Sequence, residues 1–77
     1  MVERRVTDAT LLREIGQAID GEYWMLPMAK RRGVADRTVR RWANEETEIP
    51  AGIWPELRGD LEAHRRRLDA LIKKLPR

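Results

Sequence analysis

The chain has 77 residues, enough for one small domain, and its 16 lysine and arginine residues against 13 acidic residues give a formal net charge of +3. It has no cysteine, which excludes disulfides, thiolate catalysis and cysteine-bound metal. With one histidine, no serine and no glycine-rich phosphate loop, we expect no enzyme, and no metal, cofactor or small-molecule ligand.

The N-terminus is charged rather than signal-like and no apolar run of about 18 residues exists, so we expect a cytoplasmic chain without a membrane segment. Residues 1–6 show no periodicity and are expected to be disordered. Thr7 or Asp8 is expected to cap a first helix that ends at Asp20-Gly21. The apolar residues predicted to line one side of this helix are Leu11, Leu12, Ile15, Ala18 and Ile19.

Three residues around the end of this helix carry specific expectations. Gly16 lies within the helix, where it should allow a neighbouring helix to come close. Trp24 is expected to cover a small core, whereas Tyr23 fits either the core or a DNA phosphate contact. Pro27 is expected to begin the second helix, where its missing N–H is harmless.

The stretch from Pro27 to Asn44 reads as two short helices that meet at Gly33, which adopts positive φ at little cost. The second helix, about residues 35–44, has an apolar stripe at the spacing i, i+4 and i+7, formed by Ala35, Val39 and Trp42. Its opposite stripe consists of Arg37, Arg40, Arg41 and Asn44. This arrangement is typical of a helix that packs on its own domain and reads DNA with its outer face.

Positive charge is concentrated on the same stretch. Between Lys30 and Trp42 there are six basic residues and one acidic residue, so this part carries +5 while the other residues sum to −2. We expect Arg37, Arg40 and Arg41 to contact bases or phosphates, and Lys30 and Arg31 to hold phosphates. Thr38 either touches a phosphate or fills the side of the helix. Asp36 either accepts from a cytosine or, as we expect, caps its own helix.

The residues after this helix return the chain to the core. Glu45, Glu46 and Glu48 are expected in a solvated loop, and Asn44 is expected to take the left-handed conformation that ends the helix. The next apolar residues, Ile49, Pro50, Ile53 and Trp54, should pack on the core, with Pro55 as the first residue of a long helix that runs to about Lys74.

A heptad seam runs along this long helix, with spacings of 4, 3, 4, 3 and 4 between Leu57, Leu61, His64, Leu68, Leu71 and Leu75. The early part should pack on the preceding helices. The part from His64 onward has no obvious partner left in so short a chain, so we expect a homodimer through Leu61, His64, Leu68, Leu71 and Leu75 in preference to a frayed or intramolecular end.

The segment PMAKRRGVADRTVRRW resembles the helix-turn-helix of the repressor and Cro-like DNA-binding domains of phages and bacteria. The matching residues are Ala29, Gly33, Val34, Thr38, Val39 and Trp42, and the likeness covers about residues 10 to 58. The chain departs from that pattern at Arg32, where an apolar residue is usual, and at Ala35, where a capping serine or threonine is usual. The resemblance implies a transcriptional regulator associated with the nucleoid of a bacterial or phage-infected cell.

These observations predict an all-α bundle of four to five helices: residues 1–6 disordered, 7–58 a helix-turn-helix domain, and 55–75 a long C-terminal helix. The predicted function is sequence-specific binding of double-stranded DNA. The alternative is a protein-interaction module or an antitoxin-type protein that captures a partner through the C-terminal helix.

Overall fold

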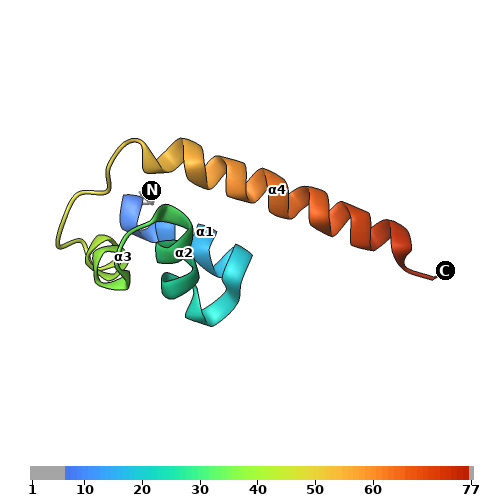
Figure 1. Ribbon diagram of the computed structural model, residues 1–77, viewed down its shortest axis with the longest axis horizontal. Helices are drawn as coiled ribbons and strands as arrows, with labels where there is room; N and C mark the ends of the chain where they lie inside the picture. Colours follow the sequence, from blue (N-terminus) through green and yellow to red (C-terminus); the bar gives the residue numbers. More distant parts are fainter. Residues whose placement is uncertain (1–6, 77) are drawn as a thin grey trace, which may run out of the picture.

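The computed structural model describes residues 7–76 and is helical, with no strand in that range. Figure 1 shows three short helices packed beside the start of a long fourth one. The helices are α1 (Asp8–Asp20), α2 (Met25–Arg32), α3 (Asp36–Ala43) and α4 (Ile53–Lys74), with a 3-10 turn, η1 (Gly21–Tyr23), between α1 and α2. The predicted all-α class is therefore confirmed. The disorder expected for residues 1–6 lies outside the described residues.

No helix among residues 7–76 combines the length and the apolar character that crossing a bilayer requires.

The core consists of side chains from all four helices. Leu12, Met28, Val39 and Leu57 are fully buried, and the indoles of Trp24 and Trp42 lie beside them. Ala9, Ile15, Ala29, Ala43 and Ile53 complete the buried set. The expectation that Trp24 and Trp42 belong to the core is confirmed.

The inward face of α1 differs from the predicted stripe. Leu11 is 41% exposed and Ala18 is exposed as well, whereas Ala9 and Gly16 are buried. The buried face is centred on Leu12, and at about 100° per residue Leu11 lies well round the helix from it. The prediction was therefore wrong for Leu11 and Ala18, because an apolar side chain at the edge of a stripe need not face the core.

Trp24 packs directly on the backbone of α1 at Gly16. A Cβ atom placed on Gly16 would lie 2.2 Å from Cε3 of the Trp24 ring, so only glycine fits there. The glycine was expected to admit a neighbouring helix. It instead admits an indole, which buries a large apolar area in a small domain.

The helix ends explain where the chain turns. Thr7 caps α1, since its hydroxyl accepts from the Thr10 amide at 3.0 Å. Gly33 has φ 70° and ends α2, while the Val34 amide donates to the Ala29 carbonyl at 3.0 Å. The predicted turn at Gly33 is thus confirmed.

The two helices expected to begin at proline begin two residues earlier. Pro27 is the third residue of α2, which starts at Met25, and Pro55 is the third residue of α4, which starts at Ile53. The first amides of a helix have no intrahelical partner, so proline fits anywhere in the first turn and does not mark its first residue.

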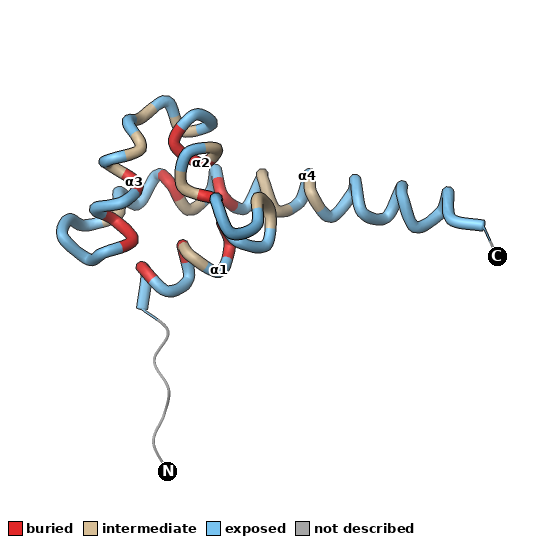
Figure 2. The backbone as a smooth tube through the Cα atoms, turned by 90° about the horizontal axis from the view of Figure 1, so that it is seen from below, coloured by how far each residue is buried: buried red, intermediate tan, exposed pale blue. Residues whose placement is uncertain are grey.

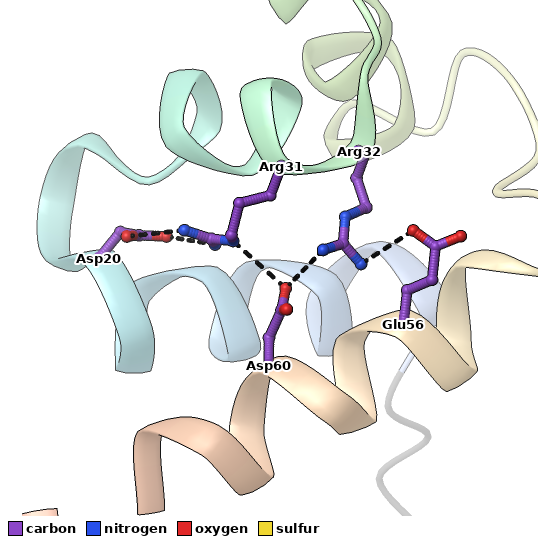
Figure 3. Close-up of polar contacts among 5 residues, drawn as sticks. All are labelled: Asp20, Arg31, Arg32, Glu56 and Asp60. Carbon is purple, nitrogen blue, oxygen red and sulfur yellow. Dashed lines mark hydrogen bonds and ion pairs between the residues drawn. The ribbon is translucent and has the colours of Figure 1, made fainter. Parts of the chain in front are cut away.

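An ionic cluster of five residues joins α2 to α1 and α4 (Figure 3): Asp20, Arg31, Arg32, Glu56 and Asp60. Arg32 Nη2 lies 2.8 Å from Asp60 Oδ2 and Arg32 Nη1 lies 3.1 Å from Glu56 Oε1. Arg31 lies 2.6 Å from Asp20 and 3.2 Å from Asp60. The hydrogen bond to Asp20 raises the pKa of Arg31.

Arg32 is the most buried member of the ionic cluster, with a side chain only 6% exposed. Its methylene stem takes the place of the apolar residue that is usual at this position, while its guanidinium reaches the carboxylates of α4. Its Nε and Nη1 atoms are buried without a hydrogen bond, although Nη1 lies within ion-pair distance of Glu56. The position of α4 therefore depends on charge as well as on apolar packing.

The second half of α4 leaves the bundle. Figure 2 shows buried residues only in the bundle and the first turns of α4, with the far half exposed. The seam is divided accordingly: Leu57 is fully buried, Leu61 packs partly on the core, and Leu68, Leu71 and Leu75 are exposed. Ile72 is exposed beside them.

Gly16→Ala should lower the free energy of unfolding by about 1–3 kcal/mol, because the new methyl group would displace the Trp24 indole. Gly59→Ala is the matched control: it lies within α4 with nothing within 4 Å, and should raise stability by up to about 1 kcal/mol. Urea denaturation followed by circular dichroism measures both. Equal effects of the two changes would contradict the packing of Trp24 on Gly16.

Asp60→Ala should lower the free energy of unfolding by about 1.5–3 kcal/mol, because it removes a charged hydrogen-bond partner from the buried Arg32. Asp69→Ala, on the exposed half of the same helix, should change it by less than about 0.5 kcal/mol. The same denaturation experiment applies, and a cost no greater than that of the control would show that the ionic cluster contributes no stability.

Candidate nucleic-acid interface

The orientation of α3 is set by its inward residues. Val39 has no exposed surface, Trp42 is 4% exposed, and Ala43 is buried beside them. Ala35 was predicted to share this stripe, but it is exposed and stands as the N-cap residue, with an extended backbone at φ −71° and ψ 150°. That prediction was wrong because the helix begins one residue later, at Asp36.

The opposite face of α3 carries exposed arginine side chains. Arg37 and Arg41 are exposed, and neither forms an ion pair with any residue between 7 and 76. Asn44 follows on the same side at the end of the helix, with its amide nitrogen 3.5 Å from a Glu46 carboxylate oxygen. Arg37, Arg41 and Asn44 form the centre of what we call the α3 outer face.

Arg40 lies at the edge of the α3 outer face, paired with Asp36. Arg40 Nη2 is 3.1 Å from Asp36 Oδ2, and both side chains remain about half exposed. Asp36 was expected to cap α3, but no side chain caps this helix. It is the first helical residue, and its carboxylate turns along the helix to Arg40, so the capping prediction was wrong.

The remaining candidates lie on either side of this face. Thr38 is half-buried on the flank of α3, and Lys30 is exposed on α2. Arg31 instead lies on the flank of α2 that faces α1 and α4, where Asp20 and Asp60 hold its guanidinium (Figure 3). The structure therefore brings Arg37, Arg40, Arg41 and Asn44 onto one helix face and ties Arg31 to a different set of partners.

An acidic turn follows α3. Glu45 has φ 61°, the left-handed conformation, while Asn44 stays at φ −92°. The Glu46 amide donates to the Arg41 carbonyl at 2.9 Å and the Glu45 amide donates to the Trp42 carbonyl at 3.2 Å. This is the same hydrogen-bond pattern as at Gly33, but with glutamate at the position that favours glycine. The expectation that Asn44 takes the left-handed conformation was wrong.

Arg13 supports α3 from behind, and the sequence analysis did not single it out. Its Nη2 donates to the carbonyl of Ala43, the last residue of α3, at 3.4 Å. Its guanidinium also lies 6.0 Å from the centroid of the Trp24 ring. Its only sequence signal is a basic residue next to the inward stripe of α1, which does not distinguish it from a solvated arginine.

Tyr23 is 81% exposed, so it does not cover the core. It lines a shallow hollow of about 400 Å³ beside the α3 outer face, together with Leu26 of α2 and the Asp36–Arg40 pair. The alternative that Tyr23 belongs to the core was therefore wrong, and its contact with a DNA phosphate stays a prediction.

Among residues 7–76 no group of three or more acidic or histidine side chains could hold a metal ion. Comparison with known proteins gives no match to a protein-family model, a curated protein or a solved structure.

Glu45→Gly should raise the free energy of unfolding by about 1 kcal/mol, because glycine adopts positive φ without the steric penalty of a side chain. Glu48→Gly removes the same charge from the same loop at a residue without positive φ, and should leave stability unchanged or lower it. Thermal denaturation compares the stabilities of the two variants directly. A gain from both would indicate relief of acidic repulsion rather than of backbone strain.

Proposed function

We propose that this protein binds double-stranded DNA sequence-specifically, with α2 and α3 acting as a helix-turn-helix of the repressor and Cro-like kind that the sequence resembles. One observation carries the proposal. The apolar side of α3 is fully packed in the core, and this leaves Arg37 and Arg41 exposed on the other side without a carboxylate partner among the described residues.

The size and chemistry of α3 support this proposal. An α-helix with its side chains is about 10–12 Å across, and a major groove about 12 Å wide admits one helix. Arginine donates two parallel hydrogen bonds to the O6 and N7 atoms of guanine, which is the commonest specific contact in that groove. Arg37 and Arg41 are therefore the leading candidates for base recognition, and Asn44 offers an amide to the same groove.

Arg40 is proposed as a DNA contact, for which a phosphate or a base must displace Asp36 from its guanidinium. Their ion pair is exposed and spans one helical turn, so it contributes only a few tenths of a kcal/mol and gives way readily to a phosphate or a base. Thr38 and Lys30 lie at the margins of the face, where they would hold phosphates. Arg31 is left out of the interface, because binding a phosphate would require it to leave two carboxylates.

The acidic turn limits how the protein can dock. Glu45, Glu46 and Glu48 would be repelled by phosphates, so the end of α3 must lie away from the DNA backbone. Tyr23 and the first turn of α2 border the opposite edge of the face, and a phenol there can donate to a phosphate. Both features favour docking with the Tyr23 edge, and not the acidic turn, next to the DNA backbone.

The biological role that fits this activity is transcriptional regulation in a bacterial or phage-infected cell, in which bound protein blocks or recruits polymerase. The exposed leucines of α4 support a homodimer, the form in which such proteins recognise symmetric sites. A dimer would read two half-sites about 34 Å apart.

A second candidate function follows from the same leucines. Leu68, Leu71, Ile72 and Leu75 form an apolar face that a partner helix could cover, as in a protein-interaction module or an antitoxin. As a protein-interaction module, the protein would bind its partner without affinity for duplex DNA at low salt, whereas an antitoxin would bind both the partner and DNA.

Selection of binding sites from random duplexes tests the proposal, and we expect a consensus with guanine at one or more positions. Arg37→Ala or Arg41→Ala should each cost about 1–3 kcal/mol at one base position if the side chain reads a base. Uniform losses on every sequence would instead assign a phosphate contact. Binding should also weaken steeply as salt increases, because contacted phosphates release counterions.

Arg66→Ala is the matched control, since Arg66 is exposed on α4 on the side opposite the leucine seam. It should leave base preference unchanged and reduce affinity no more than a distant surface charge does. No enrichment of any sequence, together with no binding to random duplex at low salt, would exclude DNA as the ligand.

A further inference from the structure

We propose that the exposed half of α4 pairs antiparallel with the same segment of a second copy, and that Leu75 of each copy occupies a hollow between α1 and α4 of the other. This inference rests on the dimer proposed above but does not require DNA binding. It gives the dimer a direction, a register and a receiving site.

The division of the seam excludes a parallel pair. The face of α4 that carries the seam is covered by the chain's own bundle as far as Leu61, with Leu57 fully buried there. In a parallel pair the second α4 would run along this same face at the same height, where the core of the first copy already lies. Only the half from His64 to Leu75 is open, so the second helix must approach from the free end (Figure 2).

The register follows from the spacing of the open seam. Laid antiparallel on itself, the segment places His64 opposite Leu75 of the second copy and Leu68 opposite Leu71. Every seam position then has a seam residue as its neighbour, and Leu75, which is 66% exposed in one chain, is covered in the pair.

The structure contains a hollow where this register needs one. It has a volume of about 370 Å³ and lies between the end of α1 and the middle of α4. Ile19, Ala63 and His64 line it, with Arg31, Asp60 and Arg67 around them. Leu75 of the second copy, which the register places opposite His64, arrives at this hollow.

Charge opposes the contact. Of the charged side chains that line the hollow, Arg31 and Arg67 are basic and Asp60 is acidic, so their net charge is +1, and the arriving segment carries Lys73 and Lys74. Lys74 of the second copy also approaches Arg67, which is a like-charge contact. The apolar seam has to outweigh that repulsion over few layers, so the dimer should be weak in the absence of DNA.

The antiparallel pair also determines the distance between the two bundles. Residue 57 of one copy then lies about 25 residue steps from residue 57 of the other along the paired helices, or about 37 Å at about 1.5 Å per residue. The two bundles therefore stand apart along the paired helices and do not contact each other side by side.

Cysteine cross-linking tests the direction, because the natural chain has no cysteine to interfere. His64→Cys and Leu75→Cys are made as separate variants and oxidised alone and as a mixture, without DNA. We expect disulfide-linked dimers only in the mixture, because position 64 of one chain faces position 75 of the other. The two copies of position 64 lie about 11 residues, or about 16 Å, apart along the paired helices, and so do the two copies of position 75.

Arg66→Cys, on the opposite face of α4, is the control and should cross-link with neither variant. Efficient self-linking of His64→Cys and of Leu75→Cys would establish a parallel pair and overturn the inference. Absence of the mixed dimer at all attainable concentrations, with sedimentation showing a monomer, would overturn it as well. Neither result depends on whether the protein binds DNA.

Discussion

The burial of Val39 and Trp42 is the constraint on which the proposed function depends. A helix of eight residues is too short to be stable alone in water, so α3 forms only because its apolar side packs on the other helices. The same packing leaves the arginine side in solvent. Stability and the presentation of Arg37 and Arg41 are therefore two consequences of one contact.

Trp24 extends this constraint to the rest of the bundle. Its indole lies on the bare backbone at Gly16, and the guanidinium of Arg13 lies near its ring while also donating to the carbonyl of Ala43. One aromatic side chain thus connects the middle of α1 to the end of α3. In a chain this short, which buries a limited fraction of its surface, two indoles supply much of the apolar volume of the core.

The long helix α4 uses one seam for two purposes. Leu57 completes the core of its own chain, whereas Leu68, Leu71 and Leu75 continue the same heptad spacing into solvent. The ionic cluster holds α2 against α4 at Glu56 and Asp60, on either side of Leu57 in the sequence. Because its most buried member, Arg32, has two carboxylates within ion-pair distance, the direction in which the free half leaves the bundle depends on electrostatic contacts. Any dimer formed through α4 inherits that direction.

The sequence alone determined the helical class, the turn at Gly33, the burial of Trp24 and Trp42, and the side of α3 that carries its arginines. These follow from local rules: the 3.6-residue period and the conformational freedom of glycine. It also indicated that the later part of the heptad seam would lack a partner within the chain.

Only the tertiary structure decided which charged groups meet. Arg31 and Arg32 are neighbours in a basic run, yet they pair with Asp20, Glu56 and Asp60 from two other helices, while Arg37 and Arg41 do not pair within residues 7–76. It likewise decided that Glu45, and not Asn44, takes the left-handed conformation. Periodicity gives the angle of a residue around its own helix, but an ion pair depends on how separate helices cross, and that is set by the packing of the whole core.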